Sequence, residues 1–207
     1  MNPDGKQAIA SIFGTPIMKV ESGLQLLKEE IDYIENIPTK DKLKDDNVAI
    51  SRSVFLLDND KKLTVIRDRM NKNVIDYINK TLCVENKFKM TNSWMARTKK
   101  EHHSHDHKNA IVSVVYYVKA DDATITFQSP NNWVTKAFNF DLDIYEYNDY
   151  NSLSMEYKVK TGDFMIFPGW LTHKATNNSD SVKTIIGANY FIKGEVGSDW
   201  NTTSLKV

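Results

Sequence analysis

The chain has 207 residues, and its 27 lysines and arginines equal its 27 aspartates and glutamates, so the formal net charge is zero. This length is enough for one domain with its own core, and the balanced charge argues against nucleic acid or an anionic membrane as a partner. Cys83 is the single cysteine, and the polar start MNPDGKQ does not resemble a signal peptide. We therefore expect a cytoplasmic protein without an internal disulfide. The longest apolar run, residues 110–118, is too short to cross a bilayer.

Two helices are predicted in the N-terminal part of the chain. Apolar residues recur every three or four positions in residues 21–37, directly before Pro38, and again from about residue 60 to residue 82. Leu63 and Ile66 of the second helix, together with Trp170 much later in the chain, are expected to have structural roles.

From Phe88 onward the hydrophobic period changes from about 3.6 residues to two. Short segments rich in β-branched and aromatic residues predict seven or eight strands, at residues 88–97, 112–119, 123–128, 136–141, 155–160, 164–168 and 184–192. Helices followed by strands predict a mainly β fold with N-terminal helices, in which an antiparallel sandwich or cupin-like jelly roll carries the helices on one outer face.

We expect one domain over residues 1–207. It divides into a helical part at about 1–85, a jelly-roll core at about 86–193 and a tail at 194–207.

Four of the five histidines lie in the segment EHHSHDH, residues 101–107, just before an apolar strand. In an unbroken strand, side chains two apart share a face, so His103, His105 and His107 would lie on one side while His102 and Asp106 point away. A pair of imidazoles two residues apart, joined by His173 from a distant strand, is typical of an open metal site. The alternative is a solvated or zinc-scavenging surface loop. His102 is assigned to that surface role, and the role of His103 stays open.

Several segments resemble one oxygenase family. These are HDHKNAIVSVVYYV, GDFMIFPGWLTH and KTIIGANYF, supported by the weaker matches IFGTPI, SVFLLDND and FKMTNSWMA, from Ile12 to about Lys193. Together they resemble the prolyl-hydroxylase-like 2-oxoglutarate and Fe(II)-dependent oxygenases of bacteria and their phages. The resemblance implies a double-stranded β-helix, Fe(II) and 2-oxoglutarate as cofactors, and His105, His107 and His173 as metal ligands. It also places the protein in the cytoplasm of a bacterial or phage-infected cell.

Three positions depart from the pattern of that family. The second ligand position is usually a carboxylate but is His107 here, so the metal site would carry one more unit of positive charge. The arginine that usually binds the distal carboxylate of 2-oxoglutarate is Lys183, which keeps the charge without the bidentate fork. The hydroxyl group often found two residues later is absent, because that residue is Ile185.

The resemblance further implies oxidative decarboxylation of 2-oxoglutarate to succinate, coupled to hydroxylation of a C–H bond by O2. Tyr117, Asn189 and Trp94 are candidate residues around the co-substrate, although burial in the core would explain aromatic residues on strands equally well. Tyr117 lies an even number of residues from His105, so it is expected to face into the barrel unless a bulge intervenes.

The substrate stays open, including whether it is a peptide, a peptidyl proline or a small molecule, and so does the oligomeric state. The acidic, tyrosine-rich residues 141–157 form either a lid over a basic or proline-containing peptide or a solvated loop. Two other functions are compatible with the sequence. One is a three-histidine, cupin-type dioxygenase that binds its substrate without 2-oxoglutarate, and the other is a non-catalytic phage binding module.

Overall fold

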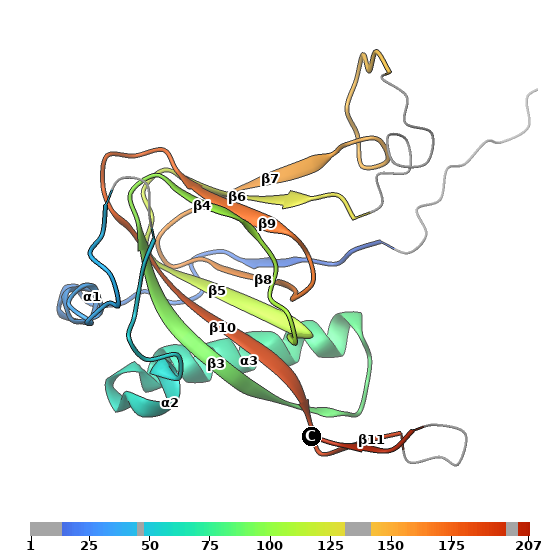
Figure 1. Cartoon of the computed structure of the whole chain (residues 1–207), viewed down its shortest axis with the longest axis horizontal. Coiled ribbons are helices and arrows are strands. Elements are labelled where there is room, and N and C mark those ends of the chain that lie inside the picture. Colours follow the sequence, from blue (N-terminus) through green and yellow to red (C-terminus); the bar gives the residue numbers. More distant parts are fainter. Residues whose placement is uncertain (1–13, 45–47, 131–141, 198–202) are drawn as a thin grey trace, which may run out of the picture.

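The computed structural model describes residues 14–44, 48–130, 142–197 and 203–207, and these form two facing antiparallel sheets (Figure 1). The larger sheet has the order β1-β8-β5-β10-β3-β2 and the smaller has the order β4-β9-β6-β7. The strands of the larger sheet are β1 (Met18–Val20), β2 (Val48–Ile50), β3 (Lys87–Thr98), β5 (Val112–Lys119), β8 (Phe164–Pro168) and β10 (Lys183–Lys193). Those of the smaller sheet are β4 (Glu101–His105), β6 (Ala123–Gln128), β7 (Ser154–Val159) and β9 (His173–Asn177). The predicted mainly β jelly roll is confirmed.

The two faces of the larger sheet build two separate apolar layers. Along β5, Val114 and Tyr116 point outward and join the cluster that includes helix residues, whereas Tyr117 joins the layer between the sheets. This alternation follows from the two-residue period of a strand. The inner layer is completed by side chains such as Ile125 and Phe167 from β6 and β8.

The helices cover the outer face of the larger sheet. They are α1 (Lys28–Glu35), α2 (Leu56–Asn59), the 3-10 turn η1 (Lys61–Leu63) and α3 (Thr64–Thr81). Figure 1 shows α3 running across the back of β5 and β10, and it contacts β5 and β8. The predicted apolar face of this helix is confirmed, because its regularly spaced residues are all buried: Leu63, Ile66, Met70, Val74, Tyr77 and Ile78.

The first helix, α1, is shorter than the range of residues 21–37 that the apolar pattern predicted. Residues 21–27 lie outside α1, and Leu27, at the N-cap, is 64% exposed. In the preceding stretch the Leu24 backbone N–H donates to the Gly162 carbonyl, 3.3 Å away. That contact with the turn before β8 holds the chain outside the helix, since tertiary packing overrides local propensity.

Other differences concern single elements. The N-terminal part also contributes β1 and β2 to the edges of the larger sheet, and a short hairpin of β11 (Glu195–Val196) and β12 (Leu205–Lys206) follows β10. Trp170 is 54% exposed, so the structural role predicted for it is wrong. The strand predicted at 136–141 lies outside the described residues.

Two short connections link the sheets at one end of the barrel. β3 passes to β4 through residues 99–100, and β9 passes to β10 through residues 178–182. Both connections are therefore at the same end, and the Lys183 and Thr98 positions pair directly across β10 and β3. The opposite end, where β4 and β8 finish, is left to the loops around His107 and Gly169.

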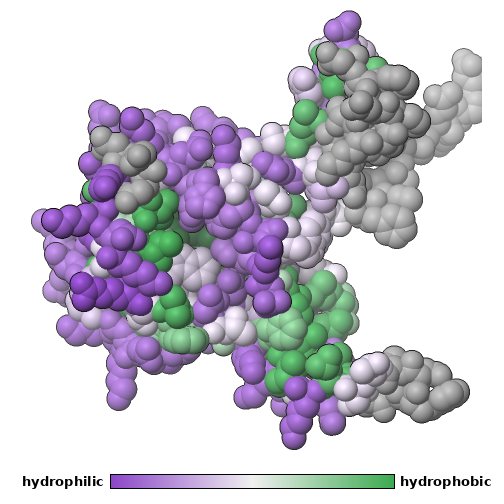
Figure 2. Space-filling model, in the orientation of Figure 1, coloured by the Kyte–Doolittle hydropathy of each residue, from purple (hydrophilic) through white to green (hydrophobic). Residues whose placement is uncertain are grey.

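Most of the surface seen in Figure 2 is hydrophilic, and hydrophobic residues gather towards the lower right of that view. No helix in the described ranges is long and apolar enough to span a membrane.

Truncation of Ile66 to Ala tests the packing of α3 against the sheet. Ile66 is 1% exposed, so the cavity should lower the free energy of unfolding by about 2 to 5 kcal/mol in urea denaturation. Ile75→Ala on the same helix is the matched control, because Ile75 is 54% exposed and should cost much less. Equal losses for the two variants would contradict this packing.

Candidate metal and co-substrate site

The pairing of β4 with β9 brings His105 and His173 together. These residues are direct cross-strand partners, and their ring centroids lie 4.5 Å apart. His173 also pairs with Phe127 of β6, so it lies within the small sheet and is 4% exposed. Two imidazoles far apart in sequence are thereby fixed on one face by backbone hydrogen bonds.

His107 reaches the same place from the loop after β4. Its backbone N–H donates to the Gly169 carbonyl at 2.8 Å, which ties this loop to the bend after β8. A side chain at position 169 would not fit, because a Cβ there would lie 2.5 Å from the Ala110 carbonyl oxygen. The His107 ring lies 5.2 Å from the rings of both His105 and His173. One ring nitrogen from each of the three histidines falls within 4.8 Å of the others.

Backbone carbonyls set the orientation of two of these rings. His105 Nδ1 lies 2.7 Å from the His103 carbonyl oxygen, and His173 Nδ1 lies 2.9 Å from the Leu171 carbonyl oxygen. A carbonyl oxygen only accepts, so the proton is on Nδ1 in both rings and the Nε2 lone pair is free. Metal-binding histidines are commonly held in this way.

Burial keeps His107 and His173 neutral. Burial, with a smaller contribution from neighbouring histidines, lowers the pKa of His107 to about 3 and that of His173 to about 4, against the ordinary value of 6.5. Neutral imidazole is the form that binds a metal. At neutral pH His107 and His173 therefore offer lone pairs without first losing protons.

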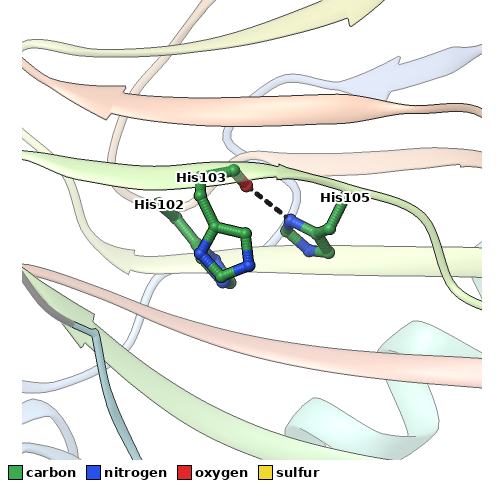
Figure 3. Close-up of side chains that lie close together, drawn as sticks. All are labelled: His102, His103 and His105. Atoms are coloured by element: carbon green, nitrogen blue, oxygen red, sulfur yellow. Dashed lines mark hydrogen bonds between the residues drawn. The ribbon is translucent and has the colours of Figure 1, made fainter.

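His102 faces the same cavity, so the prediction that it points away is wrong. In the β4–β9 register His102 pairs with Ala175 but His105 pairs with His173, which leaves one extra residue in β4. Such a bulge reverses the alternation of side chains. The rings of His102 and His105 therefore lie on one side, with centroids 4.3 Å apart. His103 is exposed, although its ring also lies near these two (Figure 3).

Lys183 is buried in this cavity without a partner. Its side chain lines the same cavity as the three histidines, it is 2% exposed, and its Nζ has no hydrogen-bond acceptor in the described part of the chain. Burial alone lowers the pKa of its amine to about 8. A buried ammonium group without an anion is costly. The cavity therefore fits a negatively charged ligand.

The residues between these groups are mostly apolar, with two hydroxyls, those of Thr98 and Tyr117. Thr98, the cross-strand partner of Lys183, lines the cavity and is 2% exposed. Sequence reasoning missed this residue, because its signal is a strand register and not a motif. The remaining wall is formed by Ala96, Val115, Ile125, Ala175 and Ile185, together with two aromatic residues.

The three predicted lining residues have different positions. Tyr117 and Trp94 both line the cavity, and Trp94 lies 5.4 Å from the His107 ring. Its indole covers Gly187, where a Cβ would approach the ring to 2.7 Å. Asn189 is not among the lining residues, and its Oδ1 accepts a hydrogen bond from the Ser113 hydroxyl at 2.7 Å. The ligand roles of all three stay predictions.

The described part of the acidic, tyrosine-rich segment does not cover the cavity. Tyr145, Tyr147 and Tyr150 are 98%, 65% and 48% exposed, and no residue from 142 to 157 lines the cavity. Asn148 and Asn151 hydrogen-bond the local backbone. For residues 142–157 this arrangement agrees with the solvated loop and not with the lid. Asp141 lies outside the described residues.

Comparison with protein families gives one match, over residues 92–187, to the family described as "Putative 2OG-Fe(II) oxygenase". This range contains all the histidines and Lys183. The predicted resemblance to 2OG-Fe(II) oxygenases is confirmed, and with it an enzyme type that uses Fe(II) and 2-oxoglutarate. No curated protein gives a significant sequence match.

Solved structures with the same fold belong to enzymes of this type. HygX from Streptomyces hygroscopicus, with nickel and 2-oxoglutarate bound, aligns over 85% of this chain and 82% of its own, at 10% identity and a TM-score of 0.57. A 2OG-Fe(II) oxygenase family oxidoreductase from Burkholderia pseudomallei aligns over 86% and 84%, at 9% identity and a TM-score of 0.55. The epimerase SnoN from nogalamycin biosynthesis aligns over 86% and 78%, at 9% identity and a TM-score of 0.57. At these sequence identities the similarity shows a shared fold only.

The buried histidines predict a pH dependence of stability in the metal-free protein. The pKa values of His102, His107 and His173 lie at about 3 to 4 in the folded chain, below 6.5. The unfolded chain therefore binds more protons between pH 6.5 and about 4, and the free energy of unfolding should fall as the pH falls. Each histidine contributes up to about 1.4 kcal/mol per pH unit.

Urea denaturation at several pH values in this window measures that slope. Replacement of the three histidines by glutamine should make it clearly shallower. An unchanged slope in the triple variant would show that other groups control the acid stability.

Proposed function

We propose that this 2OG-Fe(II) oxygenase core holds Fe(II) through Nε2 of His105 and His173 and a ring nitrogen of His107. The observation that carries the proposal is the meeting of these three imidazoles beside the buried, unpartnered Lys183. Three ligands on one side leave coordination positions open for other molecules, as catalysis at a metal requires. The second ligand position is histidine instead of a carboxylate, so the protein adds no negative charge to the metal.

The co-substrate 2-oxoglutarate would lie along the cavity between the metal and Lys183. Its keto and adjacent carboxylate oxygens would meet the metal, and its distal carboxylate would pair with the Lys183 ammonium. The Thr98 hydroxyl, on the strand opposite Lys183, is available for the same carboxylate. It supplies the hydroxyl that Ile185 lacks. A charge-assisted hydrogen bond in a buried site is stronger than one between neutral groups.

The reaction we propose is hydroxylation of a C–H bond. Substrate, 2-oxoglutarate and O2 are converted to hydroxylated substrate, succinate and carbon dioxide, and the bound iron supplies the oxygen chemistry. The protein keeps the co-substrate in one orientation and keeps water away. Tyr117 and Trp94 contribute to that exclusion, since both line the cavity. A peptidyl residue is one candidate for the substrate.

The three-histidine set also supports a second candidate, a dioxygenase whose organic substrate binds the metal directly. Such an enzyme would have no use for a buried cation at the far end of the cavity. The partnerless Lys183 therefore favours the 2-oxoglutarate enzyme.

The metal ligands are tested by anaerobic titration with Fe(II), or with Co(II) as a spectroscopic substitute. We expect about one ion per chain, and a large loss of affinity when any of His105, His107 or His173 is replaced by Ala. The exposed His103 provides the matched control, His103→Ala, with nearly unchanged affinity. If His107→Ala bound the metal normally, the ligand set would be wrong.

The co-substrate assignment is tested by Lys183→Ala in the Fe(II)-loaded protein under anaerobic conditions. Adding 2-oxoglutarate should produce the weak visible charge-transfer band of the chelate. The variant should bind 2-oxoglutarate more weakly by about 2 to 4 kcal/mol, as for one lost partner of a buried charge pair. Its Fe(II) affinity should hardly change, and Lys183→Arg should retain part of the binding. Unaltered 2-oxoglutarate affinity in Lys183→Ala would favour the dioxygenase that binds its substrate directly.

A further inference from the structure

We infer that His102 positions the co-substrate by donating a hydrogen bond to the distal carboxylate of 2-oxoglutarate, beside Lys183. The inference rests on the proposed function of the cavity and adds a residue to it. His102 would be a positioning residue, distinct from the three metal ligands.

The first support is that the backbone turns His102 inward. The extra residue in β4, between the pairs His102–Ala175 and His105–His173, places both imidazoles on the cavity side although they are three positions apart. A regular strand would have sent His102 to the outer face. Bulges next to active sites commonly re-aim one side chain in this way.

The second support is the place of His102 along the cavity. It lies on β4 three residues before His105, closer to the short connections that join the two sheets. The same end carries Lys183 and Thr98, which are cross-strand partners. All three side chains line one cavity. His102 therefore lies beside the path that 2-oxoglutarate would occupy between the metal ligands and Lys183.

The third support is a shortage of donors at this end. A carboxylate has two oxygens and accepts about four hydrogen bonds. Lys183 is a point charge without the planar fork of arginine, Thr98 and Tyr117 have one hydroxyl each, and Ile185 has none. The His102 imidazole adds one directed N–H donor to this end of the cavity. This is what an anion site in a buried cavity requires.

A competing role for His102 is that of a fourth metal ligand. Its ring nitrogen groups with those of His103 and His105, within 4.8 Å, whereas the other group consists of His105, His107 and His173. His102 is thus next to His105 but outside the set that would surround the metal. Figure 3 shows this group, in which the His105 ring is already held by the His103 carbonyl.

The test compares two 2-oxo acids in anaerobic, Fe(II)-loaded protein. One is 2-oxoglutarate, and the other is 2-oxovalerate, which has a methyl group in place of the distal carboxylate. His102→Phe should weaken 2-oxoglutarate binding about tenfold or more, the loss expected for one hydrogen bond to a charged group. Binding of 2-oxovalerate and of Fe(II) should hardly change. His102→Gln keeps an N–H donor and should restore part of the 2-oxoglutarate affinity.

Controls separate this inference from the proposed function. His103→Ala removes an exposed neighbouring imidazole and should leave both acids unaffected. Loss of Fe(II) affinity in His102→Phe would make His102 a metal ligand and overturn the inference. Equal weakening of the binding of both acids would show that His102 is a packing residue and would also overturn the inference.

If Lys183→Ala weakens 2-oxoglutarate binding but His102→Phe does not, the inference alone fails. If Lys183→Ala has no effect, the proposed function fails.

Discussion

The antiparallel pairing of β4 with β9 is the constraint on which the whole site depends. It sets His105 opposite His173, and its single extra residue turns His102 into the same cavity. The register is fixed in turn by the pairing of β9 with β6, which places Phe127 beside His173. A slip by one residue would send these imidazoles to the outer face, since strand side chains alternate. The backbone hydrogen bonds that pair β4, β9 and β6 are therefore the main cause of the arrangement of these side chains in the cavity.

The charges inside the cavity have one sign. Its lining includes four histidines and Lys183 but no aspartate or glutamate. A divalent metal and a protonated lysine together carry three positive charges, and a 2-oxoglutarate dianion would cancel two of them. In oxygenases with a carboxylate ligand, the protein itself supplies one of these negative charges. With His107 as the proposed ligand in place of that carboxylate, the demand for an anionic ligand would increase, because unbalanced charges are costly in a dry site.

Much of this architecture could be predicted from the sequence, because strong two-residue alternation marks strands with few competing alternatives. The bounds predicted for β5, β6 and β8 agree with the structure, and the spacing of His105, His107 and His173 predicted the group that the fold brings together. The face of His102 could not be predicted, since a bulge leaves no simple signal in the sequence. Trp170 was misjudged because large aromatic residues are usually buried. Leu27 was misplaced because an apolar period does not reveal where tertiary contacts end a helix.

The outer core and the cavity make opposite contributions to stability. In the metal-free protein, three imidazoles with lowered pKa values cost free energy at acidic pH, and the partnerless Lys183 costs free energy at neutral pH as well. The apolar layer between α3 and the larger sheet offsets this cost at a distance from the site. Ligands that bind only the folded chain add stability in proportion to the logarithm of their concentration over Kd. The same groups that destabilise the empty cavity should therefore make the loaded protein more resistant to unfolding, which ties recognition of the anion to the integrity of the barrel.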